Sequence, residues 1–171
     1  MMEGNLFNIS KETFDLNSVI LDIIKDCTIK LEKLPKFDSQ FKKKISFQLH
    51  GFDRKIMVNA DRQLISKVVY DIIDNAINFI IKEGLISIFV EQKIDDEGKN
   101  IVVVRIKDNG EGIHPDLNSR LFTKFACKSS YGIGLGLYIS KEIIQRHNGT
   151  IWGKNNQDGS CLLYTSDAAD D

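Results

Sequence analysis

One long stretch of the chain limits the fold more than any other feature, because its apolar residues recur every three or four positions. Over residues 61–81 this spacing predicts an amphipathic helix with a single buried face. Asp61 is expected to cap its first turn, and Gly84 to end it. A helix with one apolar stripe needs a second layer to pack against. The stripe consists of Ile65, Val68, Val69, Ile72, Ile73, Ala76, Ile77 and Ile80.

The rest of the chain supplies elements for that second layer. A further helical pattern covers residues 15–34, and another begins at residue 134 and ends near His147. Apolar and polar residues alternate between these patterns, which predicts strands with one buried face. The order of the elements predicts an α/β fold: a two-layer α/β sandwich with a mixed, mostly antiparallel sheet and helices on one face. The expected strands are 45–49, 56–58, 85–92, 101–107, 150–154 and a short last one at 161–164.

Composition narrows the class of protein. With 171 residues, 42% of them hydrophobic, the chain suits one domain with a real core. A net charge of -1 gives no electrostatic reason to expect nucleic acid or a membrane surface as partner. The cysteines Cys27, Cys127 and Cys161 lack metal-ligand spacing, which suits free thiols in a reducing compartment. We therefore expect a cytoplasmic domain without direct membrane contact.

Three polar residues lie on the long helix opposite its apolar stripe. Asp71, Asn75 and Asn78 are four and three positions apart, so they project from one side. An asparagine carbonyl oxygen is a hard ligand of the kind that Mg²⁺ accepts, and this ion usually takes only one or two ligands from protein. On its own, the pattern favours a solvated helix face.

A second polar motif, residues 108–113, follows directly from an apolar strand. Asp108 would stand at the end of that strand, where its carboxylate can accept a hydrogen bond from an adenine amino group. Gly110 and Gly112 would let the backbone approach a flat ligand. The alternative is an ordinary turn, because Asp-Asn-Gly is a common turn sequence.

A third motif, residues 132–137, opens a helix. The unpaired backbone amides and the positive dipole end of a helix N-terminus can hold phosphate oxygens. No strand comes immediately before this motif, so the context of a Rossmann dinucleotide-binding fold is missing. Taken alone, the glycines equally suit a tight loop.

Together these motifs resemble the Bergerat-fold ATPase and kinase superfamily, and most closely the catalytic ATP-binding domain of two-component sensor histidine kinases. Residues 58–79 are similar to the N-box, 108–113 to the first glycine box, 120–125 to the F-box and 132–137 to the second glycine box. Residues 138–141 and 147–152 resemble the histidine-kinase branch in particular. The resemblance implies ATP and Mg²⁺ as ligands.

The resemblance also implies roles for individual residues. Asn75 would bind magnesium, Asp108 would read adenine, and Phe79 would pack near the base. Residues 123–131 would form a short lid, in which Lys128 would neutralise phosphate charge during transfer. The implied nucleotide-binding set is Asn75, Asn78, Phe79, Asp108, Gly110, Gly112, Ile113, Phe122, Gly132, Gly134, Leu135, Gly136 and Leu137.

Two positions depart from the family pattern. Asp71 and Asn78 stand where sensor kinases usually have Asn and Lys. Related ATPases and anti-sigma-factor serine kinases place a carboxylate at the first position as a general base. Asp71 is therefore an exposed helix residue, an outer ligand to magnesium or a base for ATP hydrolysis. The loss of a lysine at Asn78 removes one charge directed at phosphate.

The phosphoacceptor is the third departure. His50, His114 and His147 all lie outside the helical hairpin that carries this histidine in the family. We therefore expect the γ-phosphoryl group to pass to a histidine on a dimerisation domain that this chain lacks, and then to a response regulator. Residues 1–14 would be a remnant of that hairpin and its linker, 15–164 the ATP-binding domain, and 165–171 a disordered or non-native tail.

Such a fragment is expected to be a monomer, and its parent protein is either soluble or membrane-anchored. Two other functions stay open. The first is an ATPase or serine kinase that uses Asp71 as its base. The second is a non-catalytic module that binds nucleotide or a protein partner.

Overall fold

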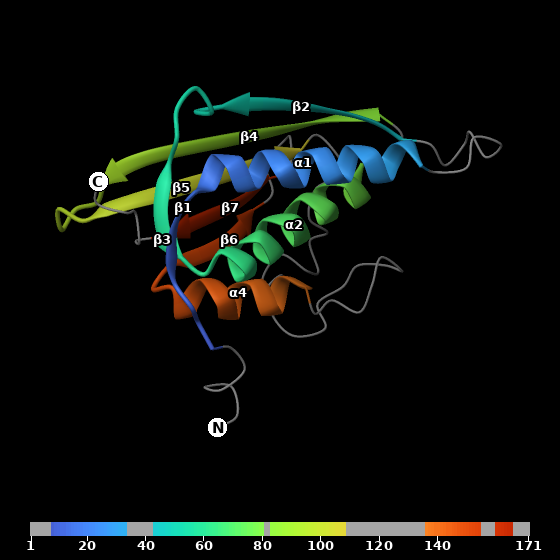
Figure 1. Cartoon of the computed structure of the whole chain (residues 1–171). Helices are drawn as coiled ribbons and strands as arrows, with labels where there is room; N and C mark the ends of the chain where they lie inside the picture. Colours follow the sequence, from blue (N-terminus) through green and yellow to red (C-terminus); the bar gives the residue numbers. More distant parts are fainter. Residues whose placement is uncertain (1–7, 34–42, 81–82, 109–135, 155–159, 166–171) are drawn as a thin grey trace.

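A five-stranded sheet forms one layer of the structure, a computed structural model that describes residues 8–33, 43–80, 83–108, 136–154 and 160–165 (Figure 1). The strand order is β2-β4-β5-β7-β6. Strand β2 runs parallel to β4, and the other neighbours are antiparallel. The strands are β2 (Lys44–His50), β4 (Glu83–Ile94), β5 (Asn100–Asp108), β6 (Thr150–Lys154) and β7 (Ser160–Thr165).

Three helices within the described residues form the second layer: α1 (Leu16–Glu32), α2 (Arg62–Phe79) and α4 (Gly136–Arg146). They share one hydrophobic core with the sheet, and Figure 1 shows them gathered on the same side of it. The expected two-layer α/β sandwich with a mostly antiparallel sheet is confirmed. None of these helices is both long and apolar enough to cross a membrane. The sheet residues in this core alternate along β4 and β5: Ile86, Ile88, Val90, Val102, Val104 and Ile106.

The sequence correctly predicts the N-cap and the buried face of helix α2. The Asp61 side chain accepts a hydrogen bond from the Leu64 N–H at 3.1 Å, which caps the first turn as expected. All eight residues of the apolar stripe are buried. The prediction that Gly84 ends the helix is wrong, because the helix ends at Phe79 and Gly84 lies inside β4. Ile80 takes an extended conformation instead and is buried in the core.

Strand β2 is less buried than its alternating pattern predicts. Ile45 and Phe47 are half-buried, and Leu49 is exposed, because β2 lies at the edge of the sheet. The opposite face carries a row of cross-strand neighbours. The His50 ring stacks on Phe89 with centroids 4.3 Å apart, and the Arg105 guanidinium lies 5.3 Å from the Phe89 centroid. Charged and aromatic side chains therefore line this face of the sheet.

Strand β1 (Glu12–Asp15) was not expected from the sequence. It pairs with β3 (Met57–Ala60) in an antiparallel ribbon outside the main sheet. Phe14 from this strand is buried in the core, so the folded domain begins before the expected boundary at residue 15. Residues 8–11 are not helical, and the remainder of the expected hairpin remnant lies outside the described residues.

A buried histidine fixes the relation between α2 and α4. His147 follows the end of α4, and its Nδ1 lies 2.8 Å from the Ile143 carbonyl oxygen. Its Nε2 accepts a hydrogen bond of 3.0 Å from the N–H of Asp61, the residue before α2. The end of α4 therefore meets the beginning of α2, and the two helices run antiparallel (Figure 1).

Candidate nucleotide-binding site

The polar face of α2 carries the first group of expected site residues. Asp71, Asn75 and Asn78 are half-buried and share this face with Lys67, which lies one turn before Asp71. The Lys67 Nζ is 3.2 Å from the Asp71 Oδ2. Side chains with oxygen atoms and an ion pair therefore follow one another along the helix, opposite the stripe that enters the core.

Asp71 has an unusual environment for a residue on a polar face. Its side chain keeps only 18% of its exposure, whereas that of Lys67 keeps 47%. Burial is the main cause that raises the pKa of the Asp71 carboxyl, Lys67 acts in the opposite direction, and the nearby Asp74 charge adds to the rise. The carboxylate is thus held in place and binds a proton more readily than an ordinary aspartate.

Asp108 is the last residue of β5, as the sequence predicts, and only 8% of it is exposed. It pairs with Ile86 in β4, and β4 begins at Glu83, four positions after α2 ends at Phe79. Asp108 therefore lies at the end of the central strand that is near the C-terminus of α2. Phe79 is the last residue of α2, although its side chain is outside the described part of the structure.

The N-terminus of α4 lies beside the C-terminal half of α2. Gly136 begins this helix, eleven positions before His147, and Ile72 lies eleven positions after Asp61. At a rise of 1.5 Å per residue, both are roughly 16 Å from the contact between His147 and Asp61. Gly136 is therefore about level with Ile72 along the helix axis. Ile72 itself is within one turn of Asp71 and Asn75 on α2. The first backbone amides of a helix have no partners within the helix, so this end of α4 carries positive potential.

The other expected site residues lie outside the described part of the chain. This applies to both glycine boxes before α4, the F-box and the lid. Gly136 and Leu137 are the first two residues of α4, and only their backbone is described. The residues outside the description are Gly110, Gly112, Ile113, Phe122, Lys128, Gly132, Gly134 and Leu135.

Lys67 was missed from the sequence, although a signal for it existed. A lysine four positions before an aspartate on a helix is a common ion pair, and here it falls on the polar face. The contact between His147 and Asp61 had no such signal, because 86 positions separate the two residues. The Ser10 N–H, which donates to the Asp61 Oδ2 at 2.9 Å, was equally hidden.

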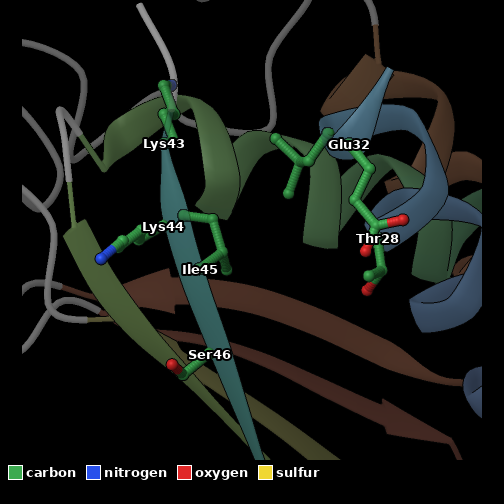
Figure 2. A pocket seen from close by; sticks show the side chains of 7 residues that line it. Thr28, Glu32, Lys43, Lys44, Ile45 and Ser46 are labelled. Carbon is green, nitrogen blue, oxygen red and sulfur yellow. The ribbon is translucent and has the colours of Figure 1, made fainter. Parts of the chain in front are cut away.

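A separate hollow of about 300 Å³ lies between the end of α1 and the start of β2 (Figure 2). None of the expected site residues lines it. Lys43 at its edge donates a hydrogen bond of 3.0 Å to the Ile77 carbonyl oxygen in the last turn of α2, and burial lowers the pKa of its ammonium. The hollow therefore belongs to the packing of helix on sheet. Its lining residues are Thr28, Leu31, Glu32, Lys43, Lys44, Ile45 and Ser46.

Comparison with known proteins agrees with this geometry. Residues 60–166 match the family described as histidine kinase-, DNA gyrase B-, and HSP90-like ATPases. Sensor protein kinase WalK of Staphylococcus epidermidis is 30% identical over 96% of this chain, and sensor protein KdpD of Clostridium acetobutylicum is 36% identical over 63% of it. The chain spans only 26% and 12% of these relatives.

Solved structures give the same result. The catalytic domain of the histidine kinase ThkA superposes with a TM-score of 0.73 and 26% identity, covering 93% of this chain and 95% of that domain. The fold and the family match together define an ATP-binding domain of the ATPase and kinase class. The chain belongs to the histidine kinase-, DNA gyrase B-, and HSP90-like ATPase family, and it is the catalytic ATP-binding domain of a sensor histidine kinase.

Proposed function

We propose that this chain binds Mg-ATP between α2, the end of β5 and the start of α4. In the context of a longer sensor kinase, it transfers the γ-phosphoryl group of ATP to a histidine on a dimerisation domain. One observation carries the proposal: the Asp108 end of β5 and the N-terminus of α4 both lie along the C-terminal half of α2, which carries Asn75. A nucleotide needs an acceptor for its base and positive potential for its phosphates, and these three pieces supply both.

In this proposal the base lies near Asp108 and the phosphates lie along α2. The Asp108 carboxylate accepts a hydrogen bond from the adenine amino group, and Phe79 packs beside the ring. The Asn75 amide oxygen suits magnesium, which takes few ligands from protein and the rest from phosphate and water. The bound ion would offset charge on the phosphates. The other binding residues are Asn78, Gly110, Gly112, Ile113, Phe122, Gly132, Gly134, Leu135, Gly136 and Leu137, with Lys128 as the cation of the lid.

The transfer itself needs few protein groups. The bond between the γ-phosphorus and its bridging oxygen breaks, ADP leaves with the electron pair, and a bond forms to the nitrogen of the acceptor histidine. Catalysis then consists of positioning and charge stabilisation, which α2 and α4 provide. The acceptor domain and a response regulator that receives the phosphoryl group are the proposed partners.

The second candidate function is ATP hydrolysis or seryl transfer with Asp71 as base. It is favoured by the half-buried carboxylate, whose pKa is raised mainly by burial and which shares a helix face with Asn75. The ion pair with Lys67 argues against this second function. The lysine stabilises the deprotonated carboxylate, which makes Asp71 a weaker base.

An Asp71→Asn substitution separates the two functions. Phosphate release from Mg-ATP is measured for the wild-type chain and for the variant, under conditions in which both bind nucleotide. The kinase function predicts negligible release in both proteins, since no water is activated. A hydrolysis rate in the wild type that falls by about 100-fold or more in the variant would establish the second function.

A further inference from the structure

The polar face of α2 has no cation at position 78, where related kinases usually have a lysine. Asn78 is neutral, and the face carries the carboxylates of Asp71 and Asp74. Arg62 and Lys67 are the two basic residues of α2, and the Arg62 guanidinium lies over the Phe14 ring, 5.8 Å from its centroid. Among the described residues of the helix, Lys67 is thus the cation available to a polyphosphate.

The Lys67 side chain reaches toward the proposed phosphate positions. Its ammonium lies 3.2 Å from the Asp71 Oδ2, so it stands level with Asp71 and about one turn from Asn75. The beginning of α4 lies at about the same level, because His147 contacts Asp61 and the two helices run in opposite directions (Figure 1). The lysine side chain is exposed at 47% and that of the aspartate at 18%, so a ligand reaches the ammonium more readily than the carboxylate.

The direction of the nucleotide determines which phosphate this ammonium meets. Asp108 and Phe79 lie at the C-terminal end of α2, where the base would bind. A chain of phosphates that starts there runs past Asn75 toward Asp71, so the terminal phosphate comes last. The ammonium of Lys67 is then placed beside the γ-phosphate.

We propose that Lys67 binds the γ-phosphate of ATP and that Asp71 holds this lysine in place until the nucleotide enters. Lys67 is then a phosphate-binding residue, and Asp71 competes with ATP for its ammonium. This inference rests on the proposed Mg-ATP site and adds to it the cation that Asn78 does not supply. Lys67 lies eleven positions before Asn78 on the same helix face. It therefore supplies the positive charge for phosphate that position 78 lacks.

Calorimetric titrations of the whole chain with Mg-ATP, Mg-ADP and AMP test this inference. Lys67→Met should weaken Mg-ATP binding by about tenfold, Mg-ADP binding less, and AMP binding not at all. Lys67→Arg keeps the charge and should bind Mg-ATP nearly as the wild type does. Asp71→Asn should bind Mg-ATP severalfold more tightly, because the ammonium loses its competing partner.

A matched control is available in strand β4. Lys93 is paired with Glu91, 3.6 Å between Nζ and Oε1, and is exposed at 54%. Lys93→Met removes the same charge from a similar ion pair on β4 and should leave all three affinities unchanged. An unchanged Mg-ATP affinity in Lys67→Met would overturn the inference, and so would an equal loss for ATP and AMP.

The same titrations distinguish this inference from the function on which it rests. If the wild type binds Mg-ATP and Lys67→Met binds it equally well, the site exists and only the role of Lys67 is wrong. If the folded wild type binds none of the nucleotides, the Mg-ATP site and the role of Lys67 fail together.

Discussion

Replacing His147 with alanine is expected to lower the free energy of unfolding by about 3–5 kcal/mol, the range for removing a large core side chain. The ring is 0% exposed, and both of its nitrogens have partners on the backbone. Alanine leaves a cavity and also leaves the buried N–H of Asp61 without its acceptor, a loss of roughly 1–3 kcal/mol by itself. Urea unfolding followed by circular dichroism measures the change.

Two further variants make this prediction specific. His147→Gln retains a side-chain acceptor for the Asp61 N–H and should lose less stability than His147→Ala. His50→Ala is the surface control, because this ring is exposed and only stacks on Phe89, a contact that contributes about 1 kcal/mol. Equal losses in His147→Ala and His50→Ala would contradict the account of His147 as the residue that joins α4 to α2.

The second large effect is expected at Asp108. Alanine at this position should weaken Mg-ATP binding by about 10- to 100-fold, because a hydrogen bond to a charged group contributes roughly 1.5–3 kcal/mol. The carboxylate stands at the end of β5 with 8% exposure, so water compensates poorly for its loss. Calorimetric titration with Mg-ATP measures the affinity.

Nucleotide selectivity provides the control for Asp108. Adenine presents an amino donor at the edge where guanine presents a carbonyl acceptor, so the wild type should prefer ATP to GTP. The Asp108→Ala variant should lose this preference as well as its affinity for ATP. A variant that binds both nucleotides weakly but still prefers ATP would show that another group reads the base.

The helical part of the fold was largely predictable because its information is local. The stripe of α2 and the cap at Asp61 are set by residues within one or two turns of each other. The end of the same helix was mispredicted, since burial of Ile80 and the pairing of Gly84 with Ile45 in β2 decide it. These contacts join segments that are far apart in sequence, so no local sequence pattern predicts them.

The candidate site, like the fold, was predictable from the sequence only where its information is local. The positions of Asp71, Asn75 and Asp108 followed from helical spacing and from the end of an apolar strand. Their common location did not, because it depends on the pairing of Asp108 with Ile86 near the start of β4. The position of α4 beside them depends on the contact between His147 and Asp61. Strand β1 was missed for a related reason, since four residues acquire strand structure only through pairing with β3.

The most direct test of the nucleotide site is a calorimetric titration of ATP, with and without Mg²⁺, into the wild-type chain and into Asn75→Ala. The account predicts micromolar binding to the wild type that depends on magnesium, and a large loss of both affinity and magnesium dependence in the variant. A folded wild type that binds no ATP would contradict the account and favour a non-catalytic interaction module. An Asn75→Ala variant that binds Mg-ATP as the wild type does would contradict the magnesium-binding role proposed for α2.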